Sequence, residues 1–198
     1  MKTIGIISDT HGKLPSSAVA ALRGEYAASQ VFHHVAVDAQ DDMVLAAQPC
    51  DLVAHAGDFG YAARAEQWIV DELCEIAPLV AVAGNCDYGE MYELNGRPLP
   101  QYAVFEECGV SCAMLHDPAD LRAAVRGAGP TRPSFISPAP RVLVHGHTHE
   151  QKVILSADGT VTVCPGAISR PRGGNPATVA IVKVDDPGMV LTVDIVAV

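Results

Sequence analysis

Histidine, aspartate and asparagine residues follow short apolar runs at several points of this sequence. In the decapeptide RVLVHGHTHE at residues 141–150, an apolar run is followed by Gly146 and then by His147 and His149. Side chains alternate along an extended chain, so these two imidazoles can point to the same side of it. Two imidazoles placed in this way suit a metal ion, although the pattern also fits a solvated, histidine-rich turn.

Other apolar runs end in the same kind of residue. Residues 3–8 precede Asp9 and His11, residues 51–56 precede Asp58, residues 79–83 precede Asn85, and residues 110–115 precede His116. Each ending by itself also fits a turn or a helix cap. In an alternating pattern of strands and helices, however, the carboxyl ends of neighbouring strands lie side by side. We therefore expect these residues to converge on one edge of a sheet.

The candidate ligands indicate a particular kind of metal centre. They are Asp9, His11, Asp58, Asn85, His116, His147 and His149. Carboxylate, imidazole and amide oxygen without thiolate suit Mn²⁺, Fe, Ni²⁺ or Zn²⁺ better than they suit a structural zinc site built from cysteines. This set exceeds what one ion takes from a protein while leaving room for a substrate. We therefore expect two divalent ions that share a carboxylate.

The elements that position these residues alternate between strands and helices, which predicts the α/β class. Helical patterns cover residues 15–23, 62–76 and 118–126, and antiparallel pairs are expected for residues 102–106 with 110–115, 151–155 with 160–164, and 177–184 with 189–196. Residues 88–100 and 127–140 are predicted to be loops because of their proline and glycine content. In the second helix, Trp68 is expected in the hydrophobic core.

Residues 24–50 have the weakest periodicity of the chain. Residues 31–37 could form a strand, but His33 and His34 would then point to opposite faces and could not serve one site together. We expect the segment to be a surface insertion, either a lid or an oligomer contact, rather than part of the metal site. The rest of the pattern predicts a single domain of residues 1–198.

The composition excludes several classes of protein. The chain has 198 residues, 49% of them hydrophobic, and six cysteines without a CxxC pair, which favours one globular domain with reduced thiols. No apolar run approaches the ~20 residues that span a bilayer, and the first apolar run meets an aspartate too early for a signal peptide. We therefore expect a cytoplasmic protein without membrane contacts. A net charge of −10 argues against nucleic acid as a partner, so an anionic substrate would need bound cations.

Taken in order, the motifs resemble those of the calcineurin-like metallophosphoesterase superfamily, and in particular its small YfcE-type phosphodiesterases. The matching pieces are DTHG at Asp9, GD at Asp58, GNCD at Asn85, the histidine His116 after a strand, and GHTH at His147. The sequence CPGAISRPRGG at residues 164–174 is similar to the carboxyl-terminal turn of the family. One position departs from the pattern, because Asp117 stands where the family commonly has glycine.

The resemblance implies a four-layer αββα sandwich with two metal ions at the strand ends. Asp9, His11, Asp58 and His149 would hold one ion, and Asp58, Asn85, His116 and His147 would hold the other. Asp58 would then bridge the two ions. Mn²⁺ is the favoured metal, with Fe, Ni²⁺ and Zn²⁺ as alternatives.

The implied activity is hydrolysis of a small phosphoester, most simply a diester, by attack of a metal-bridging hydroxide. Asp58, Asn85 and His116 would stand at the reacting centre, and Asn85, Arg170 and Arg172 would bind the phosphate, although the arginines fit a surface turn equally well. The alternatives are a metal-binding interaction scaffold like the retromer subunit of the same fold, a phosphomonoesterase, or a nuclease. Homo-oligomer formation stays open.

Cys86 bears on substrate preference. Larger relatives in the superfamily have a histidine directly after the motif asparagine, whereas Cys86 follows Asn85 here. A thiol is a poor general acid for a departing alkoxide, so we expect a preference for esters with good leaving groups. Asp87 is a second candidate donor, but a carboxyl group beside two cations should be ionised.

Overall fold

The larger of two main β-sheets carries three of the predicted strand ends. The computed structural model describes residues 1–39, 46–61, 66–87, 92–127 and 139–198. Its six-stranded sheet has the order β2-β13-β12-β1-β3-β4. The strands are β1 (Lys2–Ile7), β2 (Val31–Ala36), β3 (Leu52–His55), β4 (Leu79–Ala81), β12 (Thr178–Asp185) and β13 (Met189–Ala197). β1, β3 and β4 are parallel, so their carboxyl ends meet at one edge.

The smaller sheet repeats this arrangement. It has the order β10-β11-β9-β8-β7. Its strands are β7 (Tyr102–Glu107), β8 (Val110–Leu115), β9 (Val142–Val144), β10 (Lys152–Leu155) and β11 (Val161–Cys164). β8, β9 and β11 are parallel, and β7 and β10 pair with them in antiparallel fashion at the two edges. A short separate hairpin joins β5 (Glu93–Leu94) and β6 (Arg97–Pro98).

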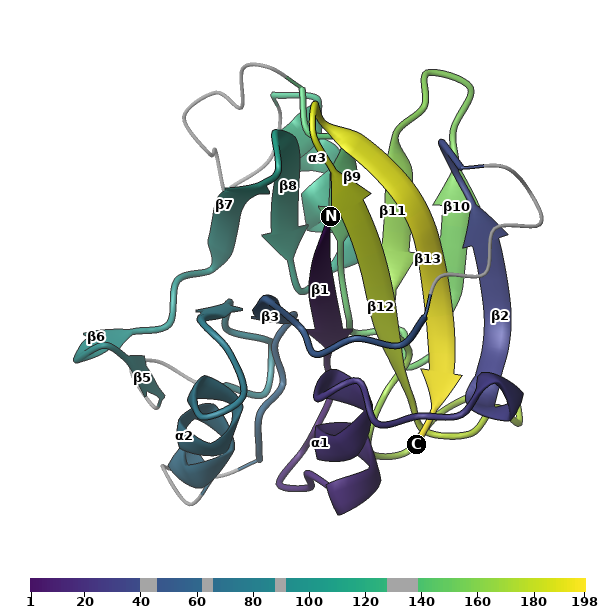
Figure 1. The fold of residues 1–198 in the computed structure, drawn as a ribbon. Coiled ribbons are helices and arrows are strands. Elements are labelled where there is room, and N and C mark those ends of the chain that lie inside the picture. Colours follow the sequence, from purple (N-terminus) through teal and green to yellow (C-terminus); the bar gives the residue numbers. More distant parts are fainter. Residues whose placement is uncertain (40–45, 62–65, 88–91, 128–138) are drawn as a thin grey trace.

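The two sheets face each other across a shared apolar core, and helices cover their outer faces (Figure 1). The helices are α1 (Ser16–Leu22), α2 (Gln67–Cys74), α3 (Pro118–Val125) and a 3-10 turn, η1 (Ala28–Gln30). Leu22 of α1 and Leu73 of α2 pack with Ile7 of β1 on the larger sheet, whereas Leu121 of α3 packs with Leu115 of β8 on the smaller one.

The central strand β12 shows why the strands of this sheet appear in the sequence as continuous apolar runs. Val179 and Ile181 belong to the core beneath α1 and α2, whereas Ala180 and Val182 belong to the core between the sheets. Successive side chains of a strand point to opposite faces, and here both faces are covered. The mixed α/β class predicted from the sequence is confirmed, and so are the three predicted antiparallel pairs.

Some details differ from the prediction. Trp68 is 45% exposed, because α2 turns Ile69 and Leu73 towards the core and leaves the indole outside. Residues 88–100 were predicted to be a loop, but their described part contains the β5-β6 hairpin. Residues 62–65 of the predicted helix and residues 128–138 of the predicted loop lie outside the described residues. In the described part of the chain, no helix is long and apolar enough to cross a membrane.

The described part of residues 24–50 includes β2, which pairs with β13 at the edge of the larger sheet. His34 on this strand contacts Asp194 of β13 through its Nδ1 atom, and neither His33 nor His34 is among the groups that gather at the strand ends. The strand predicted over residues 31–37 is therefore present. That the segment is an insertion stays a prediction.

Candidate metal centre

Polar side chains gather where the carboxyl ends of strands from both sheets meet. Asp9 and His11 follow β1, Asp58 follows β3, Asn85 follows β4, His116 follows β8, and His147 and His149 follow β9. The prediction of a single sheet edge is wrong in this respect, because β8 and β9 belong to the smaller sheet. The N–H of His147 donates a hydrogen bond to Asp9 Oδ2 (3.1 Å), which ties the two sets of loops together.

Many of these residues have a left-handed backbone conformation. The φ angles are 51° at Asp9, 43° at His11, 61° at Asp58, 68° at His147 and 60° at His149. For residues other than glycine such a conformation costs of the order of 1–3 kcal/mol, although aspartate and histidine tolerate it better than most. Such strain gathers at functional sites, and here it falls on the candidate ligands themselves.

One group of side chains surrounds the space between β1 and β9. His149 Nε2 lies 3.3 Å from His11 Nε2 and 3.2 Å from Asp9 Oδ1. His11 Nε2 also lies 3.7 Å from Asp58 Oδ2. The ligand atoms of Asp9, His11 and His149 are close enough together for a single ion to contact all three.

A second group surrounds the space between β3, β4 and β8. His116 Nε2 lies 3.4 Å from Asp58 Oδ2 and 3.0 Å from Asn85 Oδ1. His147 Nδ1 lies 2.7 Å from the same amide oxygen. Asp58 therefore belongs to both groups, with its Oδ2 atom facing an imidazole on either side.

The hydrogen bonds of the imidazoles show which atoms are free for a cation. His116 Nδ1 donates to the carbonyl of Ala56 (2.7 Å), and His149 Nδ1 donates to the carbonyl of Arg170 (2.9 Å). In the neutral rings the Nε2 lone pairs must then point at carboxylate oxygens, and the buried Asp9 Oδ1 accepts no hydrogen bond. Metal-bound histidines are typically oriented in this way by a carbonyl, so the site fits divalent cations.

The pKa values reflect how closely these groups lie. Burial tends to raise the pKa of Asp58, but the hydrogen bond and the charge of His116 outweigh it and hold this pKa at about 2. The pKa of His116 is raised correspondingly, since Asp58 outweighs burial, and that of His149 is raised by the Asp9 carboxylate, whose Oδ1 atom lies 3.2 Å from its Nε2. Burial lowers the pKa of His11. Where no cation is bound, a proton on His116 or His149 would offset the charge of the carboxylate that the ring faces.

Asp87 supports the centre from behind. Its carboxylate accepts hydrogen bonds from the backbone N–H groups of Asp58 (2.7 Å), Phe59 (2.8 Å) and Gly84 (2.7 Å). Both oxygens are thus used to hold the loops after β3 and β4. Asp87 was expected to be ionised rather than to donate a proton, and its carboxylate faces these backbone groups and does not line the hollow above the centre.

Asp117, which stands where the family commonly has glycine, caps the start of helix α3. Its side chain accepts hydrogen bonds from the N–H groups of Ala119 (2.6 Å) and Asp120 (3.2 Å) at the start of α3. Its Oδ2 atom also lies 3.6 Å from His147 Nε2. The residue therefore fixes the chain after His116 and approaches a second candidate ligand.

The candidate ligands open into a hollow of about 370 Å³ whose rim carries Arg170 and Arg172. Tyr61 also lines it, stacks on His11 with 4.4 Å between ring centroids, and lies beneath the guanidinium of Arg170 at 5.1 Å. Both arginines predicted to bind phosphate thus face the centre. Cys86 lines the same hollow, and its backbone N–H donates to Asp58 Oδ1 (2.8 Å).

Sequence reasoning missed two contributors. Tyr61 follows a glycine and shows no periodicity that would mark it as a contact of His11. His55, at the end of β3, was treated only as part of a buried strand. The N–H of Gly57 donates to His55 Nδ1 (3.1 Å), and Thr10 Oγ1 lies 3.2 Å from its Nε2. Burial lowers its pKa to about 3, so this neutral ring links the loops after β1 and β3.

The sequence matches the model of a known protein family. The model of the calcineurin-like phosphoesterase superfamily domain matches residues 1–187. No functionally curated protein matches the sequence significantly.

Several solved structures share the fold. The YfcE phosphoesterase of Escherichia coli is 19% identical with a TM-score of 0.57, and the match covers 95% of this chain and 96% of that one. Vacuolar protein sorting 29 of Cryptosporidium parvum is 17% identical with a TM-score of 0.58, covering 100% and 98%. A predicted phosphoesterase of Streptococcus pneumoniae is 20% identical with a TM-score of 0.53, covering 98% and 97%. At these identities the likeness shows the fold alone.

Proposed function

The chain belongs to the calcineurin-like phosphoesterase superfamily, and we propose that it is a phosphodiesterase that holds two divalent ions and hydrolyses small phosphoesters. The observation that carries this proposal is the position of Asp58. Its Oδ2 atom lies between His11 Nε2 (3.7 Å) and His116 Nε2 (3.4 Å), while its Oδ1 atom is held by the N–H of Cys86. A carboxylate fixed between two sets of ligands suits a bridge between two cations.

The two groups described above supply the ligands in this proposal. Asp9, His11, Asp58 and His149 hold one ion, and Asp58, Asn85, His116 and His147 hold the other. The ligands are oxygen and imidazole nitrogen, which suit Mn²⁺, with Fe, Ni²⁺ and Zn²⁺ as alternatives. Bound ions of this kind lower the pKa of water and neutralise charge on phosphoryl oxygens.

The protein's own groups then bind and orient the substrate. Arg170 and Arg172 stand on the rim, where guanidinium groups can hold nonbridging phosphate oxygens. Tyr61 packs against both His11 and Arg170, so it keeps the arginine over the hollow. The Asn85 amide and the His116 ring lie at the floor, next to Asp58. This arrangement favours a small phosphoester that can enter with its phosphate first.

The preference for a diester with a good leaving group depends on Cys86. Burial and the charge of Asp58 raise the pKa of this thiol to about 12, so it is a weak proton donor at neutral pH. Asp87 is held by backbone hydrogen bonds. Apart from the candidate metal ligands, none of the described residues that line the hollow is a ready proton donor to the leaving group. Proton donation typically contributes about 10²–10⁴-fold to the rate, most when the leaving group is basic.

The experiment is a series of kcat/KM measurements on aryl and alkyl phosphodiesters and monoesters of graded leaving-group pKa, with Mn²⁺-loaded protein. Wild type should show a steep fall with leaving-group pKa. Cys86→His should gain most on esters with poor leaving groups, and Cys86→Ala, which removes the thiol without adding an acid, should resemble wild type. A flat dependence in wild type would contradict the leaving-group preference, and absence of hydrolysis of every ester would contradict the enzyme assignment.

The rival is a metal-binding scaffold, because vacuolar protein sorting 29 has the same fold. A scaffold needs no open, cation-ready centre with arginines on its rim. If metal-loaded protein binds two ions but hydrolyses none of the mono- and diesters, the scaffold becomes the better explanation. Hydrolysis of polynucleotides in preference to small diesters would instead favour the nuclease alternative.

A further inference from the structure

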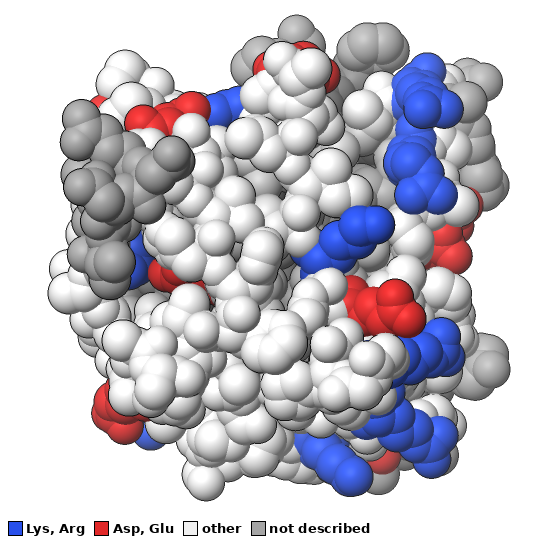
Figure 2. Space-filling view, turned by 90° about the vertical axis from the view of Figure 1, so that its right-hand side faces the viewer, with Lys and Arg blue, Asp and Glu red and all other residues white. Residues whose placement is uncertain are grey.

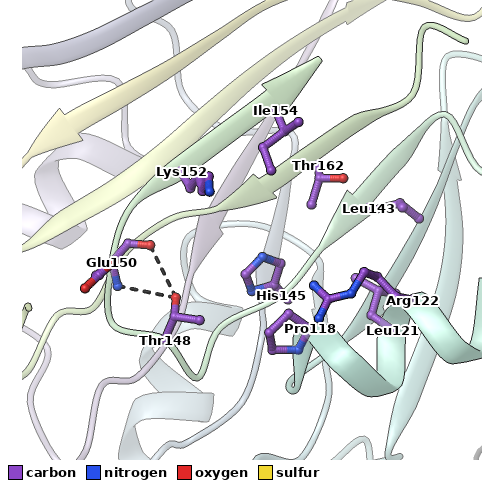
Figure 3. Close-up of a pocket in the computed structure, with 10 residues that line it drawn as sticks. All are labelled: Pro118, Leu121, Arg122, Leu143, His145, Thr148, Glu150, Lys152, Ile154 and Thr162. Carbon is purple, nitrogen blue, oxygen red and sulfur yellow. Dashed lines mark hydrogen bonds between the residues drawn. The ribbon is translucent and has the colours of Figure 1, made fainter. Parts of the chain in front are cut away.

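A second hollow, of about 260 Å³, lies on the outer face of the smaller sheet beside α3 (Figure 3). Leu143 and His145 from the β9 segment, Thr162 of β11 and Ile154 of β10 form its floor, and Arg122 of α3 stands on one wall. In the cluster beneath α3, Leu121 packs with residues of β8, with Tyr102 of β7 and with Leu143 of β9, and no residue of β10 or β11 belongs to this cluster. The outer face of β11 and β10 therefore stays open in the described part of the chain.

This hollow lies on the other side of the turn that carries two candidate metal ligands. Along residues 145–150, His147 and His149 point into the metal centre, whereas His145, Thr148 and Glu150 line the hollow. Thr148 Oγ1 donates to the carbonyl of Glu150 (3.4 Å), as the dashed lines in Figure 3 indicate. The two cavities share no lining residue, so the hollow is a site in its own right.

Two cations that have no direct ion pair face this hollow, and a single carboxylate, Glu150, lines it with them. Figure 3 places Lys152 of β10 and Arg122 of α3 on opposite sides, with His145 between them. Among the described residues, neither cation has an ion pair or a side-chain hydrogen bond. In a chain with 23 acidic and 13 basic residues, unpaired cations around one cavity are unexpected. An anion between them would relieve their mutual repulsion.

The wider surface agrees with this placement. Figure 2 shows the side of the molecule with the edge strands β2 and β10, and basic side chains gather along one border of this face. Some acidic side chains lie among them, and the remainder of the face is largely uncharged.

The floor adds a hydrogen-bonding group and an apolar surface. His145 is buried, and its Nδ1 atom donates to the carbonyl of Gly146 (2.9 Å), which leaves Nε2 without a partner among the described residues. Ile154 is 43% exposed although it is a large aliphatic residue on the strand face. A ligand for this hollow would therefore combine a charged end with a small apolar body.

We propose that the hollow binds a small organic phosphate. The Arg122 guanidinium and the flexible Lys152 ammonium donate to its phosphate oxygens, since the two cations outnumber the single carboxylate of the lining, Glu150, and a guanidinium binds phosphate through paired N–H groups. The organic part lies on Leu143 and Ile154. A protonated phosphate oxygen or a hydroxyl group donates to His145 Nε2.

The test is residue-resolved NMR of the full chain loaded with diamagnetic Zn²⁺ and titrated with phenylphosphonate, which has no hydrolysable ester bond. Signals of the Arg122 Nε–H, the His145 ring and the Ile154 methyl groups should shift and saturate. Arg122→Gln and Lys152→Gln should each weaken this binding about tenfold, as expected for loss of a charge-assisted hydrogen bond. Arg126→Gln, an exposed change at the end of α3 outside the hollow, should leave it unchanged.

The metal centre serves as an internal reference, because phenylphosphonate will also shift the signals of residues around it. Arg170→Gln should alter those signals and leave the Arg122 set as in wild type. If the Arg122 and His145 signals do not move while the metal-centre signals saturate, the proposal is overturned. It is equally overturned if benzoate or benzyl alcohol binds the hollow more tightly than phenylphosphonate.

Discussion

Two groups of buried charged side chains in this protein are neutralised in different ways. On the outer face of the larger sheet, Asp194 lies between Lys183, whose Nζ is 3.9 Å away, and His34, which donates to its Oδ1 atom. Opposite charges are thus matched directly. At the metal centre, carboxylate oxygens of Asp9 and Asp58 face the Nε2 atoms of His149 and His116. In the neutral form of each ring the single N–H proton is on Nδ1, which donates it to a backbone carbonyl.

The difference shows that a buried charge does not by itself mark a functional site. Both oxygens of the Asp194 carboxylate already face a partner within the protein, so this group can serve stability alone. The Asp58 group is complete only when protons or cations enter between its members. Five of the seven candidate ligands also have left-handed backbone conformations, whereas Lys183, Asp194 and His34 do not. The strained and incomplete group is the functional one.

The largest effect should come from Asp58→Ala. Because the shared carboxylate is lost, both ions should be bound more weakly, and kcat/KM should fall about a thousandfold or more, since metal stabilisation of the transition state is worth several kcal/mol. Metal content by elemental analysis and steady-state kinetics provide the measurement. If only one of two ions is lost and the other binds as in wild type, Asp58 is not a bridge.

Asp194→Ala should give the opposite pattern. It leaves the buried Lys183 and the partly exposed His34 without their carboxylate, so the free energy of unfolding should fall by about 3 kcal/mol. Metal content and kcat/KM of the folded protein should stay as in wild type. Denaturant unfolding together with metal analysis tests this, and a loss of metal would show that the two groups are coupled.

A smaller effect is expected for Asp87→Asn. The substitution places an amide donor against the backbone N–H groups of Asp58 and Gly84, which now donate to a carboxylate. Metal affinity should fall about 10- to 100-fold, as for other partners that hold ligands in place. Calorimetric titration with Mn²⁺ measures it. Asp71→Asn, an exposed change on α2, is the matched control and should leave the affinity unchanged.

The smallest effect concerns pH. In the metal-free protein the pKa values of His116 and His149 are raised, so their protonation stabilises the fold below the ordinary value of 6.5 and this contribution is lost as pH rises through the folded values. Metal binding requires the neutral rings and gains as pH rises. The increase in Tm on adding Mn²⁺ should therefore grow with pH. An increase that shrinks with rising pH would contradict this assignment.

The sequence predicted the centre because its ligands follow apolar strands at short, fixed spacings. DTHG and GHTH each place two ligands two residues apart, and the strands before them are recognisable as buried runs. The spacing of the motifs did not show that β8 and β9 form a second sheet, which only the resemblance implied, since pairing partners are set by contacts far apart in the chain. Trp68 was placed in the core from the helical spacing of the apolar residues, whereas the packing of α2 decides which face is buried.

Other features depend on three-dimensional proximity and leave no local signal. The role of Asp87 depends on N–H groups from two loops after different strands. The stacking of Tyr61 on His11 joins residues 50 positions apart in the chain. The hollow beside α3 exists because that short helix covers only part of its sheet. Each of these follows from packing between elements rather than from the pattern within one.

Anomalous diffraction from crystals of the Mn²⁺-loaded protein tests the central claim most directly. The account predicts two peaks about 3.5–4 Å apart, with Asp58 Oδ2 in contact with both. His11 and His149 should bind the first ion, and His116 and His147 the second. A single peak at full metal loading, or two peaks of which Asp58 touches only one, would contradict a binuclear centre bridged by this carboxylate.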